Sequence, residues 1–187
     1  QVWDAAGKLS AWSAEAVFGI APSSSFFQNA HWVGAITQQQ AKLPAGRKFH
    51  GTDMKKPEVK ALWDAVDSLS SKSISLRRSF TVNKKIAGAM VYVCGLGHYE
   101  LSLNGQKVGN SEFAPLWSDY DKTVYYNAYD VTSLLKEGVN AIGALLGNGF
   151  YNVQGGGRYR KLQIGFGPPT LLLKMVITHA DGTQEEI

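Results

Sequence analysis

The stretch that decides the fold is GLGHYELSLNGQKVGN, residues 95–110. Glycines frame its two halves, which meet at the pair Asn104-Gly105. After Gly97 every second residue is apolar, a period typical of a half-buried strand: Tyr99, Leu101 and Leu103. An Asn-Gly pair tolerates the positive φ angles of a tight hairpin turn. The stretch therefore predicts a β-hairpin.

The glycines also raise the alternative of a phosphate-binding loop. A dinucleotide fingerprint needs glycines that open a helix, whose exposed amides bind the pyrophosphate. The residues after Gly97 instead alternate like a strand, and the third glycine of that fingerprint is missing. We therefore favour the corner of a sheet over a nucleotide site.

Further strands are predicted on both sides of the hairpin. They are bounded by turn signals and cover residues 73–82, 89–94, 123–129, 139–147 and 170–178, with a short helical turn at 130–138. One other helix is expected over 57–69, where Val59, Leu62 and Val66 follow helical intervals. Because the strands do not alternate with helices, we expect an all-β fold: a jelly-roll antiparallel β-sandwich with one short inserted helix.

Composition excludes several classes of protein. The 187 residues are 44% apolar, which suits one compact domain, and the net charge of +4 is too scattered to predict a nucleic-acid partner. No apolar run approaches the length of roughly 18 residues that predicts a membrane span, and the N-terminus lacks the features of a signal peptide. The single cysteine, Cys94, lies in an apolar run and is expected to be buried.

The richest segment for function is FAPLWSDYDKTVYYNAYD, residues 113–130, which holds six aromatic residues and three aspartates. Aromatic rings stack on the C–H faces of a sugar, while carboxylates accept hydrogen bonds from its hydroxyls. For Tyr125, Tyr126 and Tyr129, on an expected strand, an ordinary core role is the favoured alternative. Trp117 and Tyr120 lie in the loop after Pro115 and are the stronger candidates for sugar contact.

The aspartates of the same segment raise two further possibilities. Asp119 and Asp121 could supply oxygen ligands to calcium, although the segment has no EF-hand spacing. They could also act as the acid and base of a glycosidase, but that role depends on a separation in space that sequence does not give.

A second candidate loop is GNGFYNVQGGGRYRK, residues 147–161. Its glycines allow a ligand to approach the backbone, and Asn148, Phe150 and Tyr151 offer hydrogen bonds and stacking surfaces. A plain surface loop is the alternative. The four histidines show no metal-ligand spacing and are interpreted as structural, and no nucleophile motif is present.

Four motifs in this region resemble the N-terminal β-sandwich domain of bacterial α-L-rhamnosidases. In that family a GxYELxxNGxxVG hairpin, an AP-x-W-[TS]-x-Y loop, a YDVTxLLKxGxN turn and an LGxGWY loop follow in this order. All four are found between Gly95 and Tyr151, and the resemblance extends weakly back to Leu76 and forward to Thr183.

The resemblance implies a galactose-binding-like jelly roll that in some members binds L-rhamnose with the help of calcium. Carried over by position, the sugar-binding residues are Trp117, Asp119, Tyr120, Asn148, Phe150 and Tyr151, with Asp119 and Asp121 as calcium ligands. Phe150 stands where the family has Trp, which weakens stacking at that position. The implied function is a non-catalytic module that recognises rhamnose-containing glycans; the alternative is a structural module that orients a catalytic (α/α)6 barrel elsewhere in the polypeptide.

The resemblance also implies a domain division. Residues 1–20 are expected to be a remnant hairpin of a preceding fibronectin-like domain, 21–73 a connecting segment, and 74–187 a jelly roll truncated at its C-terminal end. The expected partners are the glycan and the other domains of the same polypeptide, without nucleic acid or membrane. By resemblance alone, the location is periplasmic or extracellular.

Overall fold

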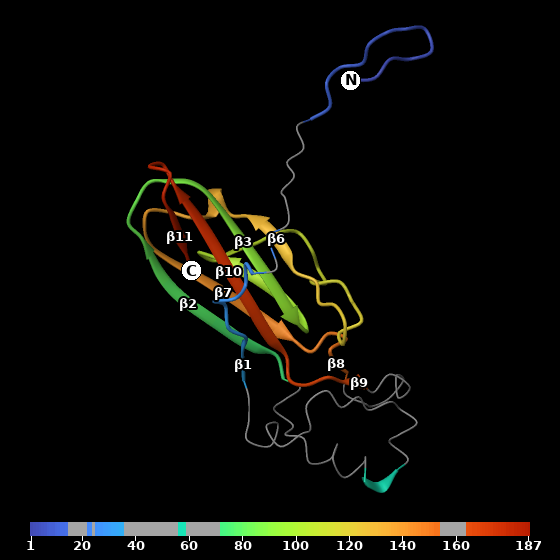
Figure 1. Cartoon of the computed structure of the whole chain (residues 1–187), viewed down its shortest axis with the longest axis vertical. Helices are drawn as coiled ribbons and strands as arrows, with labels where there is room; N and C mark the ends of the chain where they lie inside the picture. Colours follow the sequence, from blue (N-terminus) through green and yellow to red (C-terminus); the bar gives the residue numbers. More distant parts are fainter. Residues whose placement is uncertain (15–21, 24, 36–55, 59–71, 154–163) are drawn as a thin grey trace.

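The computed structural model describes residues 1–14, 22–23, 25–35, 56–58, 72–153 and 164–187. Two antiparallel sheets face each other (Figure 1). One has the order β1-β10-β3-β6, with β11 also paired to β10, and the other has the order β2-β7-β4-β5. Strands β8 and β9 form a separate pair. The all-β sandwich predicted from the sequence is confirmed.

The elements have the following bounds: β1 Val33–Gly34, β2 Ile74–Val82, β3 Ile86–Leu96, β4 His98–Leu103, β5 Gln106–Lys107, β6 Asn127–Asp130, the 3-10 turn η3 Thr132–Leu134, β7 Gly138–Gly147, β8 Asn152–Val153, β9 Ile164–Gly165, β10 Thr170–His179 and β11 Gln184–Glu186. The chain changes sheets after β1, β2, β3, β5 and β6, and it returns from β7 to the first sheet at β10 by way of the β8–β9 pair. This repeated crossing is the connectivity expected of a jelly roll.

The core lies between the sheets and follows the predicted period of two. Inward side chains of β2, β3, β4, β7 and β10 alternate with outward ones, which are polar in β2 and β4. The most deeply buried side chains include Val82, Val91, Val93, Leu103, Leu146, Met175 and Ile177. Since each strand contributes every second residue, the two sheets form one continuous apolar layer.

The predicted hairpin is confirmed in its turn geometry. Asn104 has φ +52° and Gly105 has φ +82°, and Leu103 pairs with Gln106 across the turn. The Asn104 side chain also accepts a hydrogen bond from Ala141 N at 2.9 Å and donates to Asn140 Oδ1 at 2.8 Å. The turn residue therefore ties this hairpin to β7.

The outer face of the first sheet is covered by an earlier segment of the chain. The Phe26 ring lies 4.7 Å from the Tyr92 ring of β3 and 4.6 Å from the Lys174 ammonium of β10. Lys174 also donates to Phe26 O at 2.9 Å and pairs with Glu186 at 2.8 Å. This cover explains why residues 89–94 are apolar at successive positions instead of alternating.

Of three further sequence predictions, one is corrected and two lie partly outside the described residues. The strand predicted at 123–129 begins only at Asn127. Tyr125 and Tyr126 precede the strand and lie on the surface. The strand starts late because the preceding residues form a turn, in which Thr123 N donates to Asp119 O. Of the helix predicted at 57–69, only residues 57 and 58 are described, with helical backbone. In the predicted N-terminal hairpin, residues 2–10 form a short hairpin with a Trp3–Leu9 bridge, and 15–18 lie outside the described residues.

Candidate functional site: an aromatic surface at one end of the sandwich

The two loops singled out from the sequence meet at one end of the sandwich. The loop between β5 and β6, yellow in Figure 1, lies beside the orange segment that follows β7. The Trp117 and Phe150 ring centroids are 6.0 Å apart, with 35° between the ring planes. Both side chains remain well exposed, at 71% and 50%. The structure therefore brings together the strongest candidate of each loop.

Two hydrogen bonds, one from a backbone amide and one from a side-chain hydroxyl, hold the first loop in place. Tyr99 N of β4 donates to Ala114 O at 2.8 Å, which anchors the loop just before its exposed part. Further along, Ser118 Oγ donates to Thr123 O at 2.7 Å and closes the turn that follows Trp117. Trp117 thus projects from a loop that is fixed at both sides.

Four rings contact one another in succession on this surface, and we call this set the ring row: Phe113, His98, Phe150 and Trp117. The His98 imidazole lies 5.7 Å from the Phe113 ring and 5.9 Å from the Phe150 ring. Burial lowers the pKa of His98 below its ordinary value, so the imidazole is neutral at pH 7 and can both donate and accept a hydrogen bond. The row is apolar with one polar ring inside it.

The backbone at Gly149 allows His98 to lie in the row. Gly149 has φ +52°, and a Cβ at this position would lie 2.8 Å from His98 N. A side chain there would push the segment after β7 away from β4. Glycine is therefore required for Phe150 to reach His98.

The same two loops also contribute to a second aromatic group. Tyr120, Tyr151 and Phe166 have ring centroids 5.2 to 5.6 Å apart and are half-buried. Burial raises the pKa of both tyrosines. Of the six predicted sugar-binding residues, Tyr120 and Tyr151 thus belong to this supporting group, and Trp117 and Phe150 to the exposed row.

The predicted polar contacts have protein partners. The Asp119 carboxylate lies 3.0 Å from the Lys122 ammonium, and Asn148 Oδ1 accepts a hydrogen bond from Asn152 Nδ2 at 3.1 Å. Each bond joins the side chain to a residue three or four positions further along the chain. Asp119 keeps half of its side-chain surface exposed, so it can still accept a hydroxyl hydrogen bond.

The predicted calcium ligands do not form a site by themselves. Within the described ranges, no group of three carboxylate, imidazole or thiol side chains is placed to hold an ion. Asp119 is paired with an ammonium, and two carboxylates are fewer than the six to eight oxygens that calcium takes. Calcium therefore stays a prediction, and backbone carbonyls or a sugar would have to complete its shell.

Two residues of this surface, His98 and Phe166, carry no signal for a ligand site in the sequence. The histidines show no metal-ligand spacing, and Phe166 lies outside both candidate loops. Both interact through ring contacts between segments far apart in the chain, which a linear pattern does not display. The expectation for Cys94 is confirmed: it is buried, and burial raises its pKa to about 11.

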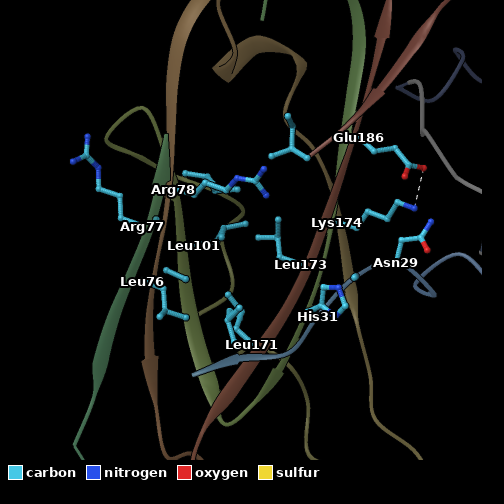
Figure 2. Close-up of a pocket in the computed structure, with 16 residues that line it drawn as sticks. Asn29, His31, Leu76, Arg77, Arg78, Leu101, Leu171, Leu173, Lys174 and Glu186 are labelled. Carbon is cyan, nitrogen blue, oxygen red and sulfur yellow. Dashed lines mark ion pairs between the residues drawn. The ribbon is translucent and has the colours of Figure 1, made fainter. Parts of the chain in front are cut away.

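A cavity in the described structure lies apart from the ring row. A cavity of about 570 Å³ opens between β2 and β10 (Figure 2). Its walls are core side chains such as Leu101 and Leu171, and Arg78 points toward it while its neighbour Arg77 points away. None of the six predicted sugar-binding residues lines it. We place the candidate site on the ring row, because no Phe, Tyr or Trp lines the cavity and a sugar stacks best on such rings.

Comparison with known proteins decides the family. Residues 84–187 match the model of the α-L-rhamnosidase N-terminal domain. This chain belongs to that family. An α-L-rhamnosidase of Formosa agariphila is 33% identical over the whole chain, and one of Streptomyces avermitilis is 41% identical over 67% of it.

Solved structures agree with the α-L-rhamnosidase assignment. The native Aspergillus terreus enzyme matches with 38% identity and a TM-score of 0.58 over 62% of the chain. The Streptomyces avermitilis enzyme, whose structure was solved in complex with L-rhamnose, matches with 40% identity and a TM-score of 0.56 over 63%. The chain spans only 19% and 12% of the two curated relatives, and 13% and 11% of these two structures. In the described part of the chain, no helix is long and apolar enough to cross a membrane.

Proposed function

We propose that this chain is a non-catalytic carbohydrate-binding module of an α-L-rhamnosidase, and that it binds rhamnose-containing glycans on the ring row. The observation that carries the proposal is the pairing of Trp117 and Phe150 at 6.0 Å, with both rings exposed, in a domain of this family. The two rings come from loops fixed by the sandwich, so the surface exists before a ligand arrives. A preformed surface lowers the entropic cost of binding.

The chemistry of the surface fits a deoxysugar. L-rhamnose has an apolar C–H face and a methyl group that can lie on the tilted Trp117 and Phe150 rings. Its hydroxyls can donate to the exposed Asp119 carboxylate and exchange hydrogen bonds with the neutral His98 imidazole. The small phenyl ring of Phe150 offers less stacking area than an indole, so we expect weak binding.

We further propose that the whole polypeptide hydrolyses α-L-rhamnosides in the periplasm or the extracellular space. In this proposal the chain described here recognises the glycan. The relatives named above are α-L-rhamnosidases, of which this chain spans less than a fifth. In this proposal catalysis lies elsewhere in the polypeptide. Release of phenol from phenyl α-L-rhamnoside by the purified chain would contradict it.

Isothermal titration with L-rhamnose tests the binding proposal. We expect weak binding that Trp117→Ala or Phe150→Ala reduces at least several-fold, with Trp12→Ala as the matched control because Trp12 is equally exposed in the N-terminal hairpin. Each titration is run with calcium and with a chelator, which tests the role of Asp119 and Asp121. Absence of heat in both conditions would end the proposal.

A second function is favoured by a specific observation, the size of the exposed apolar surface. Phe113 and Leu116, in the same loop as Trp117, are 73% and 74% exposed. Such a patch also suits packing against another domain of the same polypeptide, which the module would then orient. In that case the isolated chain should self-associate in sedimentation experiments, L-rhamnose should leave the association unchanged, and Trp117→Ala should abolish it.

A further inference from the structure

The outer face of the first sheet is covered only in part. Strands β10, β3 and β6 lie side by side in this sheet (Figure 1), and β11 pairs with β10. Phe26 lies over Tyr92 and Lys174 on the outer face, and next to it the face is hollowed by about 510 Å³. We call this hollow the sheet trough. None of the four residues of the ring row lines it.

The strand register arranges the floor of the sheet trough. Glu186 is the direct partner of Val176, Val176 of Met90, and Met90 of Asp130, so the four side chains share one face. The two carboxylates therefore lie at opposite ends of an apolar floor. They are separated by three strand spacings, or about 14 Å. The floor is thus longer than one sugar ring.

A glycine opens the middle of this floor. Gly88 lies inside strand β3, opposite Thr178, and a Cβ there would have only Thr132 Oγ1 within 4 Å, at 4.0 Å. The register shifts between Thr178 and His179, beside Gly88, but Gly88 does not have a positive φ. Neither packing nor the bulge therefore requires a glycine. A glycine within a strand often marks the close approach of a ligand.

Rings and hydrogen-bond acceptors surround the floor. Phe26 and Tyr92 line one side, with ring centroids 4.7 Å apart. Asp130 Oδ1 accepts hydrogen bonds from Thr132 N at 2.9 Å and Thr132 Oγ1 at 2.6 Å, and among the described residues no donor is bonded to Oδ2. At the other end, Glu186 Oε1 lies 2.8 Å from the Lys174 ammonium, and the Glu186 side chain is 55% exposed. One oxygen of each carboxylate can therefore accept a hydrogen bond from a ligand.

We propose that the sheet trough is a second carbohydrate site, which binds an uncharged oligosaccharide across the strands. Phe26 and Tyr92 pack against the C–H surface of the sugar, and Asp130 and Glu186 accept hydrogen bonds from hydroxyls at the two ends. Gly88 lets a sugar in the middle approach the backbone. An acidic glycan would be repelled by the two carboxylates, which is why the ligand is uncharged. The site is independent of the ring row and takes only the identity of the sugar, rhamnose, from the proposed function.

Calorimetric titration with a linear α-L-rhamnotriose tests the sheet trough. The trisaccharide should still bind to Trp117→Ala, in which binding at the ring row is weakened. Adding Gly88→Val to that variant should weaken the binding at least tenfold, because valine fills the floor. Ser79→Val is the matched control, since Ser79 is exposed on the outer face of β2 and its replacement should leave the affinity for the trisaccharide unchanged.

A second variant tests the acceptor at one end. Asp130→Asn keeps the Oδ1 acceptor and replaces the other carboxylate oxygen with an amide donor. It should weaken binding of the trisaccharide about tenfold, the usual effect of losing a hydrogen bond to a charged group. Thermal unfolding of each variant shows whether it is folded.

Titration with L-rhamnose separates this inference from the proposed function. Gly88→Val alone should leave binding of L-rhamnose at the ring row unchanged. If L-rhamnose binds but Gly88→Val retains full affinity for the trisaccharide, or Trp117→Ala loses the trisaccharide entirely, the inference is overturned and the proposed function stands. If only the trisaccharide binds and Gly88→Val removes it, the sheet trough is supported and the ring row is contradicted. If neither sugar binds, both proposals fail.

Discussion

Replacing Asn140 by alanine is expected to lower the free energy of unfolding by about 4 kcal/mol, since four buried hydrogen bonds are lost at about 1 kcal/mol each. Its side chain is only 1% exposed. It accepts from Asn104 Nδ2 at 2.8 Å and Lys136 N at 3.0 Å, and it donates to Lys136 O at 2.7 Å and Gly138 O at 2.9 Å. These bonds join the β4–β5 hairpin to the turn that leads into β7.

Two further variants separate hydrogen bonding from packing. Asn140→Leu fills the volume but restores none of the four bonds, so it should be no more stable than Asn140→Ala. Asn110→Ala is the matched control, because Asn110 is exposed on the surface and its replacement should change stability by less than about 0.5 kcal/mol.

Equilibrium unfolding in urea measures the effect. With a slope of about 2 kcal/mol per molar urea, the midpoint for Asn140→Ala should fall by about 2 M. A decrease below about 1 kcal/mol, or recovery of stability in Asn140→Leu, would refute the reasoning that the bonds, and not the volume, matter here.

Two other predictions concern a glycine and an ion pair. Gly109→Ala should destabilise the chain by about 2 kcal/mol more than Gly105→Ala in thermal unfolding. Both glycines have positive φ, but only at Gly109 would the new Cβ meet a ring, that of Tyr129 at 2.5 Å. Equal losses of stability in the two variants would contradict this prediction. A hydrogen bond from Lys84 lowers the pKa of Asp181, so the pair stabilises the fold above the unfolded pKa of about 3.9 and the effect is lost as pH falls further toward the folded value. Urea midpoints between pH 7 and 2 should therefore show a deficit in Asp181→Asn that shrinks as the pH falls below about 4. A deficit that is constant with pH would count against the pair.

The sandwich could be predicted because its signals are local. The alternation after Gly97 and the Asn104-Gly105 turn each depend on neighbouring residues, and the register of β4 and β5 follows from them. The same locality explains the error at Tyr125 and Tyr126. Their side chains suit a strand, but a turn closed by Asp119 O delays the start of β6.

The candidate site could be predicted only in part, for the opposite reason. Trp117 and Phe150 can be predicted because each lies in a recognisable loop, the first aromatic-rich after Pro115 and the second glycine-rich after Gly147. The contribution of His98 depends on a contact across the sandwich end, between β4 and the segment after β7. Only the packing of the sheets sets that contact, and no spacing within one segment encodes it.

The cover over Tyr92 and Lys174 has a practical consequence for anyone who shortens this protein. The family match begins at Lys84, yet β2 and the Phe26 segment precede it, and Val33 pairs with Leu171. A recombinant fragment that begins at Lys84 would lack β2, an edge strand of one sheet, and the Phe26 segment that covers the other sheet. The apolar side chains exposed in this way would favour precipitation. Excision should start upstream of Phe26 to yield a well-behaved sample.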